Sequence, residues 1–199
     1  MKKLPCKMAA TQGLCNRQGN LLVVIMAESG NHGGREELMA ELKRLDIETE
    51  IVEHPEVFTV EAMMPHLQDI SGVVGKNLFL KDKKKGLWLL TARHNRVVNL
   101  AKLAKTVGAP GGLRLADESV LQEKLGVTQG CVTPFALFND RGKEVKFLLD
   151  RDLTDKGHPR VNFHPMTNVA TLGMAPDDFL KFVRETGHEP ILVNFDALE

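Results

Sequence analysis

The fold of this chain is decided by residues 75–91, which read GKNLFLKDKKKGLWLLT. Two apolar runs, residues 77–81 and 87–91, flank the polar segment 82–86. Short apolar runs joined by a few polar residues that end in glycine predict the two strands of an antiparallel hairpin. We therefore expect a β-hairpin here and build the rest of the domain outward from it.

Helices are predicted on both sides of this hairpin. Leu38, Leu42 and Leu45 recur at helical spacing within an otherwise charged segment, which is typical of an amphipathic helix. Further helices are predicted at residues 59–68, 99–107, 117–125 and 177–186, with Thr59, Asn99 and Asp117 as starting residues and Gly108, Gly126 and Gly187 just past three of the ends.

Further strands complete the expected sheet. They are predicted at residues 47–51, 135–138, 144–149, 161–163, 171–174 and 191–195. Residues 135–138 and 144–149 flank a turn-like segment and are expected to form a second hairpin. Because hairpins are intermixed with helices, we expect an α+β fold with a mixed, largely antiparallel sheet and surrounding helices. Residues 34–199 contain no linker-like segment and are expected to form one domain.

Composition limits the classes of function. Of 199 residues, 43% are hydrophobic, which is enough for a sizeable core. The 26 basic and 26 acidic residues balance, which argues against nucleic-acid binding through bulk charge but leaves a local basic face open. Cys6, Cys15 and Cys131 form no C-x-x-C pair, so a reducing, cytoplasmic compartment is expected.

The N-terminal residues 1–33 show no sustained apolar period. Their apolar run, residues 21–26, is too short to cross a membrane or to serve as a secretory signal. We expect a disordered extension and no membrane partner.

Generic catalytic motifs are missing from the sequence. It contains neither G-x-x-x-x-G-K-[ST] nor G-x-S-x-G, and its seven histidines never fall in H-E-x-x-H spacing. We therefore expect no metal and no cofactor.

Three segments carry the chemical information: residues 75–82 (GKNLFLKD), 130–138 (GCVTPFALF) and 163–168 (FHPMTN). In this order and spacing, with His54-Pro55 and residues 177–180, they resemble the prolyl-tRNA-synthetase-associated (YbaK-type) editing domain. The resemblance covers about residues 35–196. Each segment alone is weak evidence, whereas the ordered set is specific, and it is most similar to the free-standing branch that clears alanine from proline tRNA.

The resemblance implies the fold of that domain and a set of site residues. Lys76 matches its active-site lysine, and Gly130 and Pro134 match a G-x-x-x-P loop that shapes the aminoacyl pocket. Asn77 and His164 match the alanine-clearing branch, while the cysteine-clearing branch has another pattern at these places. The implied activity is deacylation of alanyl-tRNA(Pro). The implied partners are the acceptor end of mischarged tRNA and prolyl-tRNA synthetase.

These residue types suit ester hydrolysis. A lysine ammonium can bind the terminal phosphate or stabilise oxyanion charge, and glycine lets main-chain N–H groups approach the ester. Asn77 and His164 can orient the amino acid or the ribose hydroxyls. We assign Lys76, Gly130 and His164 to catalysis and Asn77, Pro134 and Lys81 to substrate binding.

The substrate of such a site follows from size. A pocket made for proline cannot strongly exclude the smaller alanine, because one methylene is worth only about 1–3 kcal/mol. A second, smaller site must therefore remove the error and reject proline sterically. Phe79 and Val132 are candidates for its walls.

Structural explanations stay open beside these assignments. Lys76 could be a solvated surface residue, and Asn77 could simply begin a strand. Gly130 and Pro134 could form a turn, and His164 could be a capping or core residue. Lys81 could belong to a charged hairpin. Cys131 is interpreted as a packing residue, since no partner base is visible nearby. For the whole chain, the alternatives are a catalytically inactive tRNA- or synthetase-binding module of the same fold, and an adaptor without an RNA function.

Overall fold

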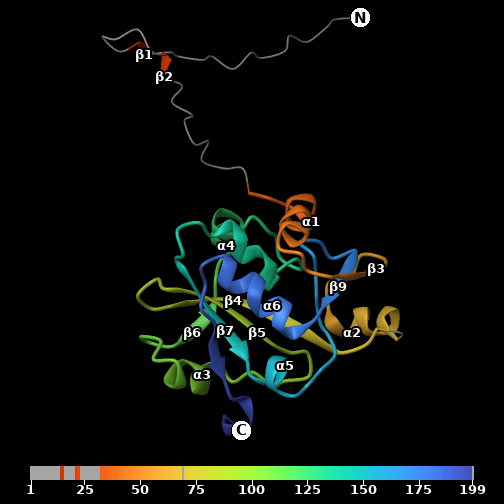
Figure 1. The fold of residues 1–199 in the computed structure, drawn as a ribbon. Coiled ribbons are helices and arrows are strands. Elements are labelled where there is room, and N and C mark those ends of the chain that lie inside the picture. Colours follow the sequence, from red (N-terminus) through yellow and green to blue (C-terminus); the bar gives the residue numbers. More distant parts are fainter. Residues whose placement is uncertain (1–13, 16–20, 23–31, 69, 199) are drawn as a thin grey trace, which may run out of the picture. The chain divides into compact units, whose positions relative to one another are not determined.

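The computed structural model describes residues 14–15, 21–22, 32–68 and 70–198 (Figure 1). Its contacts divide the chain into two compact units, Met1–Asn31 and His32–Glu199. In the first unit, the described residues form the short antiparallel pair β1 (Leu14–Cys15) and β2 (Leu21–Leu22). The extension predicted for residues 1–33 lies mostly outside the described residues, so its disorder and its boundary at residue 34 stay predictions.

The second unit is built on an eight-stranded mixed sheet (Figure 1). In sheet order the strands are β10 (Ile191–Val193), β7 (Val145–Asp150), β5 (Leu87–Arg93), β4 (Val73–Asp82), β8 (Val161–Phe163), β9 (Ala170–Met174) and β3 (Glu50–Glu53), with β6 (Leu113–Leu115) also beside β4. Strands β5 and β6 on β4, β9 on β8 and β3 on β9 pair antiparallel. Strands β7 on β5, β10 on β7 and β8 on β4 pair parallel. The predicted α+β fold with a mixed, largely antiparallel sheet is confirmed.

The hairpin predicted from residues 75–91 is confirmed as β4 and β5. Their register runs from Gly75 opposite Arg93 to Lys81 opposite Leu87. The buried Asp82 carboxylate closes the turn, because it accepts the main-chain N–H of Gly86 at 2.9 Å and the Trp88 indole N–H at 3.1 Å. One acidic side chain therefore fixes both the turn and the first residues of β5.

A helix lies at each of the five predicted places, and one further short helix, at residues 152–155, was not predicted. The helices are α1 (Arg35–Arg44), α2 (Val60–Met63), α3 (Leu100–Thr106), α4 (Glu118–Leu125), α5 (Asp152–Asp155) and α6 (Pro176–Glu185), with 3₁₀ turns η1 (Met64–Leu67), η2 (Pro134–Asn139) and η3 (Phe195–Ala197). Thr59 caps α2 by accepting the Ala62 N–H at 3.2 Å, and Asn99 caps α3. The single helix predicted at residues 59–68 is divided into α2 and η1 where Pro65, which lacks an N–H, enters.

The second predicted hairpin is wrong. Residues Pro134–Asn139 form η2, and β7 joins the sheet parallel to β5 instead of pairing with them. The Phe135 ring is fully buried and meets Phe163 and Phe182 edge to face, with centroids 5.8 and 5.5 Å apart. A short apolar run that is buried on every side has no period, so sequence cannot separate a strand from a helical turn.

One predicted strand is displaced and another is shorter than predicted. Strand β3 begins at Glu50 rather than at residue 47, because the Ile47 N–H still bonds to the Leu42 carbonyl at the end of α1. Strand β10 ends at Val193, where the chain turns into η3.

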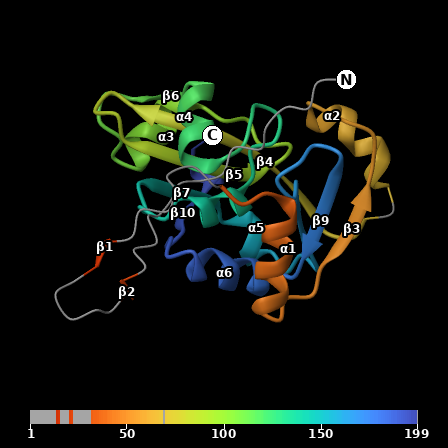
Figure 2. The ribbon, with the colours of Figure 1, turned by 90° about the horizontal axis from the view of Figure 1, so that it is seen from above.

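The sheet separates two hydrophobic layers. On one face, α1, α4 and α6 bury Leu38, Leu121 and Phe179 against it. On the other face, α3 packs Leu103 in a layer that includes Trp88. The end of α1 and α6 lie side by side (Figure 2), joined by the hydrogen bond from Lys181 Nζ to the Leu45 carbonyl at 2.6 Å.

We expect Phe135→Ala to lower the free energy of unfolding by about 3–5 kcal/mol, because it empties the centre of the aromatic cluster. Val97→Ala is the matched control, since Val97 is 85% exposed. Urea denaturation followed by circular dichroism measures both variants. A loss for Phe135→Ala as small as that of the control would contradict this packing.

Candidate functional site

The candidate site lies at an interruption in the pairing of β4. On one edge, β4 pairs continuously with β5. On the other edge, Val73 and Val74 pair with β8, and residues 80–82 pair with β6. In the described part of the chain, no strand pairs with residues 75–79 on that edge.

The register of β4 decides which main-chain groups face this interruption. The His94 N–H bonds to the Val74 carbonyl at 2.9 Å, and the Ala116 N–H bonds to the Phe79 carbonyl at 3.0 Å. Main-chain groups of successive strand residues alternate between the two edges. Asn77 therefore turns its N–H and C=O away from β5 and toward the interruption.

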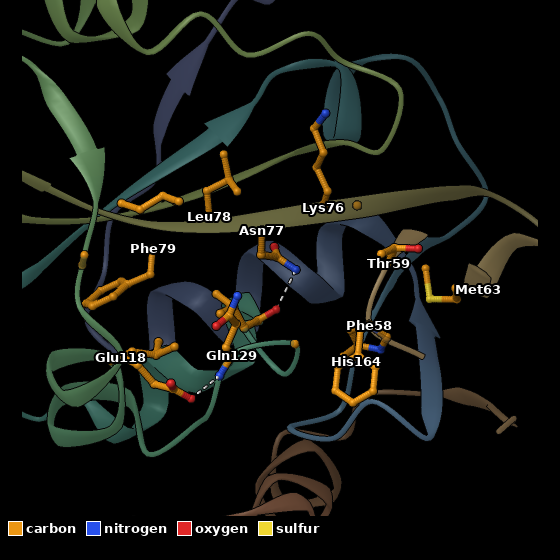
Figure 3. A pocket seen from close by; sticks show the side chains of 16 residues that line it. Phe58, Thr59, Met63, Lys76, Asn77, Leu78, Phe79, Glu118, Gln129 and His164 are labelled. Atoms are coloured by element: carbon orange, nitrogen blue, oxygen red, sulfur yellow. Dashed lines mark hydrogen bonds between the residues drawn. The ribbon is translucent and has the colours of Figure 1, made fainter. Parts of the chain in front are cut away.

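A cavity of about 430 Å³ lies at this place (Figure 3). Its walls come from residues 75–79 of β4, from Phe58, Thr59 and Met63 around α2, from the start of α4, from the 129–132 loop and from His164. This volume is in the range of small-ligand pockets. The cavity brings together four of the predicted site residues, Lys76, Asn77, Gly130 and His164, and both proposed walls, Phe79 and Val132.

The side chains of Lys76 and Asn77 extend to opposite sides of β4 (Figure 3), and both residues belong to the lining of the cavity. Lys76 Nζ donates a hydrogen bond to the main-chain carbonyl of Arg96. Burial lowers the pKa of Lys76, and the nearby Glu61 carboxylate opposes that shift. An ammonium with part of its hydration removed interacts more strongly with an incoming anion than a solvated one does.

The Asn77 amide ties the sheet to the loop that carries Gly130. Its Nδ2 donates to the Val132 carbonyl at 3.0 Å, and its Oδ1 accepts the Thr91 hydroxyl at 2.7 Å. Asn77 thus positions one wall of the cavity. Its predicted role in orienting substrate stays a prediction.

Gly130 has a backbone that favours glycine. Its φ is +90°, in the left-handed region that side chains rarely adopt. A Cβ at this position would lie 3.1 Å from Cδ1 of Phe58, whose side chain is largely exposed. The main chain of Gly130 therefore lies against an aromatic ring at the cavity.

His164 has one bonded ring nitrogen, Nδ1, and a second, Nε2, for which the described residues offer no hydrogen-bond partner. Its Nδ1 donates to the Ala170 carbonyl at 3.1 Å, so in the neutral ring the proton lies on Nδ1 and Nε2 carries a lone pair. Burial lowers the pKa of His164, the bond to Ala170 opposes the shift, and the ring of His54, 6.2 Å away, lowers it further. The imidazole is therefore neutral at pH 7.

Comparison with known proteins decides the family. Residues 54–182 match the family described as the aminoacyl-tRNA editing domain.

The chain belongs to the aminoacyl-tRNA editing domain family.

Relatives of this editing domain agree with that assignment. The chain is 58% identical to the prolyl-tRNA synthetase associated domain-containing protein 1 of Bos taurus, over 81% of this chain and 95% of the relative. It is 33% identical to the prolyl-tRNA editing protein ProX of Acetoanaerobium sticklandii, over 83% and 96%. A crystal structure of "a putative trans-editing enzyme for prolyl tRNA synthetase" has the same fold, with a TM-score of 0.57 at 22% identity over 80% of this chain and 96% of that one. The predicted resemblance is confirmed.

Two predicted site residues of the editing domain do not line the cavity. Pro134 is buried at the first position of η2 and is not among the residues that line the cavity. Lys81 forms an ion pair with Asp117, the residue before α4. Asp117 thus starts its helix without capping it through its side chain. The substrate-binding roles of Pro134 and Lys81 stay predictions.

Several lining residues of the editing domain were not predicted. Phe58 and Met63 come from the segment around α2, and Glu118 accepts the Gln129 N–H at 3.2 Å to close the loop before Gly130. A single aromatic residue within a polar segment carries no periodic signal, so only its proximity to His54-Pro55 could have pointed to Phe58.

The described residues were also searched for a metal site, a reactive thiol and a membrane-spanning helix. Among the residues that the structure describes, no group of three His, Cys, Asp or Glu side chains could hold a metal ion. Cys131 is half-buried and packs against the main core. No helix within the described ranges is long and apolar enough to span a membrane.

We expect Gly130→Ala and Gly108→Ala to lose similar stability, about 1 kcal/mol, because both glycines have a positive φ. Only Gly130→Ala should change ligand binding or turnover, since a Cβ at Gly108 meets nothing within 4 Å, whereas one at Gly130 presses on Phe58. Thermal melts and deacylation rates measure the two effects. Equal activity in the two variants would contradict a site at Gly130.

We expect His164 to titrate below 6.5, the ordinary pKa of histidine, because burial disfavours its charged form. On acidification the unfolded chain takes up this proton first. His164 therefore leaves the free energy of unfolding unchanged above about pH 6.5 and lowers it as the pH falls further. Imidazole NMR titration gives the midpoint, and His164→Gln should remove this part of the pH dependence. A midpoint above 6.5 would refute the argument.

Proposed function

We propose that this protein hydrolyses the ester of mischarged aminoacyl-tRNA, with alanyl-tRNA(Pro) as its substrate. One observation carries the proposal: Lys76 with its partly desolvated side chain, the His164 imidazole and the loop of Gly130 belong to the lining of one small cavity beside the interrupted edge of β4. In the reaction, water attacks the ester carbonyl carbon and the bond from that carbon to the ribose oxygen breaks. The released ribose oxygen takes up a proton from the water and becomes a hydroxyl, and the amino acid leaves with a free carboxylate.

Lys76 supplies positive charge where negative charge lies or develops. Lys76 is half-buried and belongs to the cavity lining, and its ammonium binds the terminal phosphate or the oxyanion of the tetrahedral intermediate. A preorganised charge in a partly dehydrated site stabilises the transition state more than the same charge in water does. Gly130 supports this role, because its main chain can approach the ester closely.

His164 supplies a hydrogen-bond acceptor. With its proton held on Nδ1 by the Ala170 carbonyl, its Nε2 accepts a hydrogen bond from the substrate's amino group or from the attacking water. An imidazole that stays neutral at pH 7 is suited to this role, since a protonated ring has no lone pair to offer.

Substrate size follows from the cavity walls. Phe79, Val132 and Met63 bring apolar side chains to the cavity lining. Such walls accept the methyl side chain of alanine and exclude the larger proline ring by steric contact. The cavity therefore selects by size a second time, after the synthetase has failed to exclude alanine. A distant relative's name, prolyl-tRNA editing protein, is consistent with this substrate class.

The partners of the proposed reaction follow from where the ester lies. The cavity would take the acceptor end of the tRNA, with Lys81 and Pro134 as further substrate-binding residues. The names of several relatives also support prolyl-tRNA synthetase as a partner. Both would meet the protein in the cytoplasm.

Single-turnover deacylation tests the proposal directly. Proline tRNA charged with alanine, with proline or with cysteine is incubated with excess protein, and the remaining ester is followed over time. We expect rapid loss of alanine and retention of proline. Binding of the tRNA without turnover of any ester would replace the proposal with the alternative function, a catalytically inactive tRNA- or synthetase-binding module.

We expect Lys76→Ala to slow deacylation about 10²-fold or more, because it removes one electrostatic stabiliser. Lys76→Arg should also be slow, since a guanidinium places the same charge in a different shape. Lys105→Ala, which removes an exposed lysine of α3, is the matched control. Saturating enzyme separates chemistry from binding. A wild-type rate for Lys76→Ala would exclude the catalytic role of Lys76.

A further inference from the structure

The turn between β5 and α3 supplies the group that holds Lys76. The ammonium of Lys76 donates to the main-chain carbonyl of Arg96, 20 residues further along the chain. The turn is closed by the Arg96 N–H, which bonds to the Arg93 carbonyl at 3.0 Å. The position of the ammonium therefore depends on where this carbonyl lies.

The side chain of Arg96 anchors this turn to three carboxylates. Its Nε lies 3.1 Å from Asp150 Oδ2, its Nη2 lies 2.5 Å from Asp152 Oδ2, and its Nη1 lies 2.6 Å from Asp196 Oδ1. These carboxylates come from the end of β7, the start of α5 and η3. The side chain of Arg96 is only 10% exposed and that of Asp150 is fully buried, so solvent and salt screen these pairs weakly.

Asp150 holds the same turn a second time, through the main chain. Its Oδ2 accepts the Arg93 N–H at 3.1 Å, and its Oδ1 accepts the Asp152 N–H at 3.1 Å. One buried carboxylate thus ties the turn at both ends, through the N–H of Arg93 and the guanidinium of Arg96. The carbonyl of Arg96 has little freedom to move.

Net stability is a weak explanation for an arginine at this place. Removing ions from water costs free energy that their mutual attraction often fails to recover, and apolar replacements are frequently as stable. What a guanidinium offers is a rigid plane of donors that contacts several carboxylates at once, which an ammonium on a flexible stem cannot reproduce. Fixed geometry is therefore the property that this network provides.

We propose that Arg96 is a positioning residue, whose ion pairs fix the carbonyl that holds the ammonium of Lys76. The inference rests on the proposed function for the use of Lys76 in deacylation. The structural link between Arg96 and Lys76 can be tested without any tRNA.

A double-mutant cycle tests the catalytic part. We expect Arg96→Lys to slow single-turnover deacylation of alanyl-tRNA(Pro) about tenfold or more, because small misplacements of a catalytic group have large effects on rate. In a Lys76→Ala background, the same change should cause no further slowing. An equal loss in both backgrounds would mean that Arg96 acts independently of Lys76, and it would overturn the proposal.

NMR of the lysine ammonium groups tests the structural part. The Lys76 signal, assigned by its absence in Lys76→Ala, should show faster proton exchange in Arg96→Lys. The matched control is Lys156→Met, which removes contacts of 3.1 Å to Asp152 and 3.7 Å to Asp196 but leaves Arg96 and its turn unsubstituted. An unchanged Lys76 signal in Arg96→Lys would overturn the proposal. If the wild-type protein did not deacylate alanyl-tRNA(Pro), the proposed function would be wrong. The NMR measurement would still test whether Arg96 positions the Lys76 ammonium.

Asp196→Asn covers the case in which Arg96→Lys does not fold. The Asp196 side chain is 56% exposed, so its replacement removes the ion pairs with Arg96 and Lys156, while Arg96 keeps its pairs with Asp150 and Asp152. We expect a smaller change of the Lys76 signal in the same direction. A folded Asp196→Asn protein with wild-type Lys76 exchange and a wild-type rate would contradict the positioning role.

Discussion

The divided edge of β4 is the constraint on which the rest of the structure depends. One strand of ten residues serves two partners on a single edge, β8 near its start and β6 near its end. Between them the ladder stops, and main-chain groups of Asn77 face a cavity instead of a strand. Residues far apart in sequence, such as Phe58, Gly130 and His164, meet because the segments that carry them surround this gap.

Each group at the gap is held by an element that packs elsewhere. The loop of Gly130 is tied to β4 by the Asn77 amide, and the ring of His164 is fixed by the Ala170 carbonyl of β9. The Lys76 ammonium is held by the turn that Arg96 anchors. Such support is what a site needs if its groups are to meet a transition state without reorganising first.

Sequence predicted the parts of this arrangement that local rules determine. The β4–β5 hairpin, the Asn99 cap and the amphipathic α1 follow from turn chemistry and periodicity, and the ordered motifs identified the family. The Pro134–Asn139 segment was wrongly predicted to contain a strand. It is buried on all sides, so its sequence lacks the apolar–polar alternation that separates a strand from a helical turn. Contacts between residues that are distant in sequence could not be predicted from local patterns. Examples are the ion pair of Lys81 with Asp117, the burial of Pro134 and the network around Arg96.

The central claim is that the interrupted edge of β4 receives the aminoacyl end of the tRNA. The most direct measurement is an amide NMR titration with 3′-alanylamino-3′-deoxyadenosine, in which an amide replaces the ester so that the ligand cannot be hydrolysed. The account predicts that the largest shifts fall on residues 75–79, on the 129–132 loop and on His164, with β10 unaffected. Saturable binding that leaves residues 75–79 unshifted would contradict it.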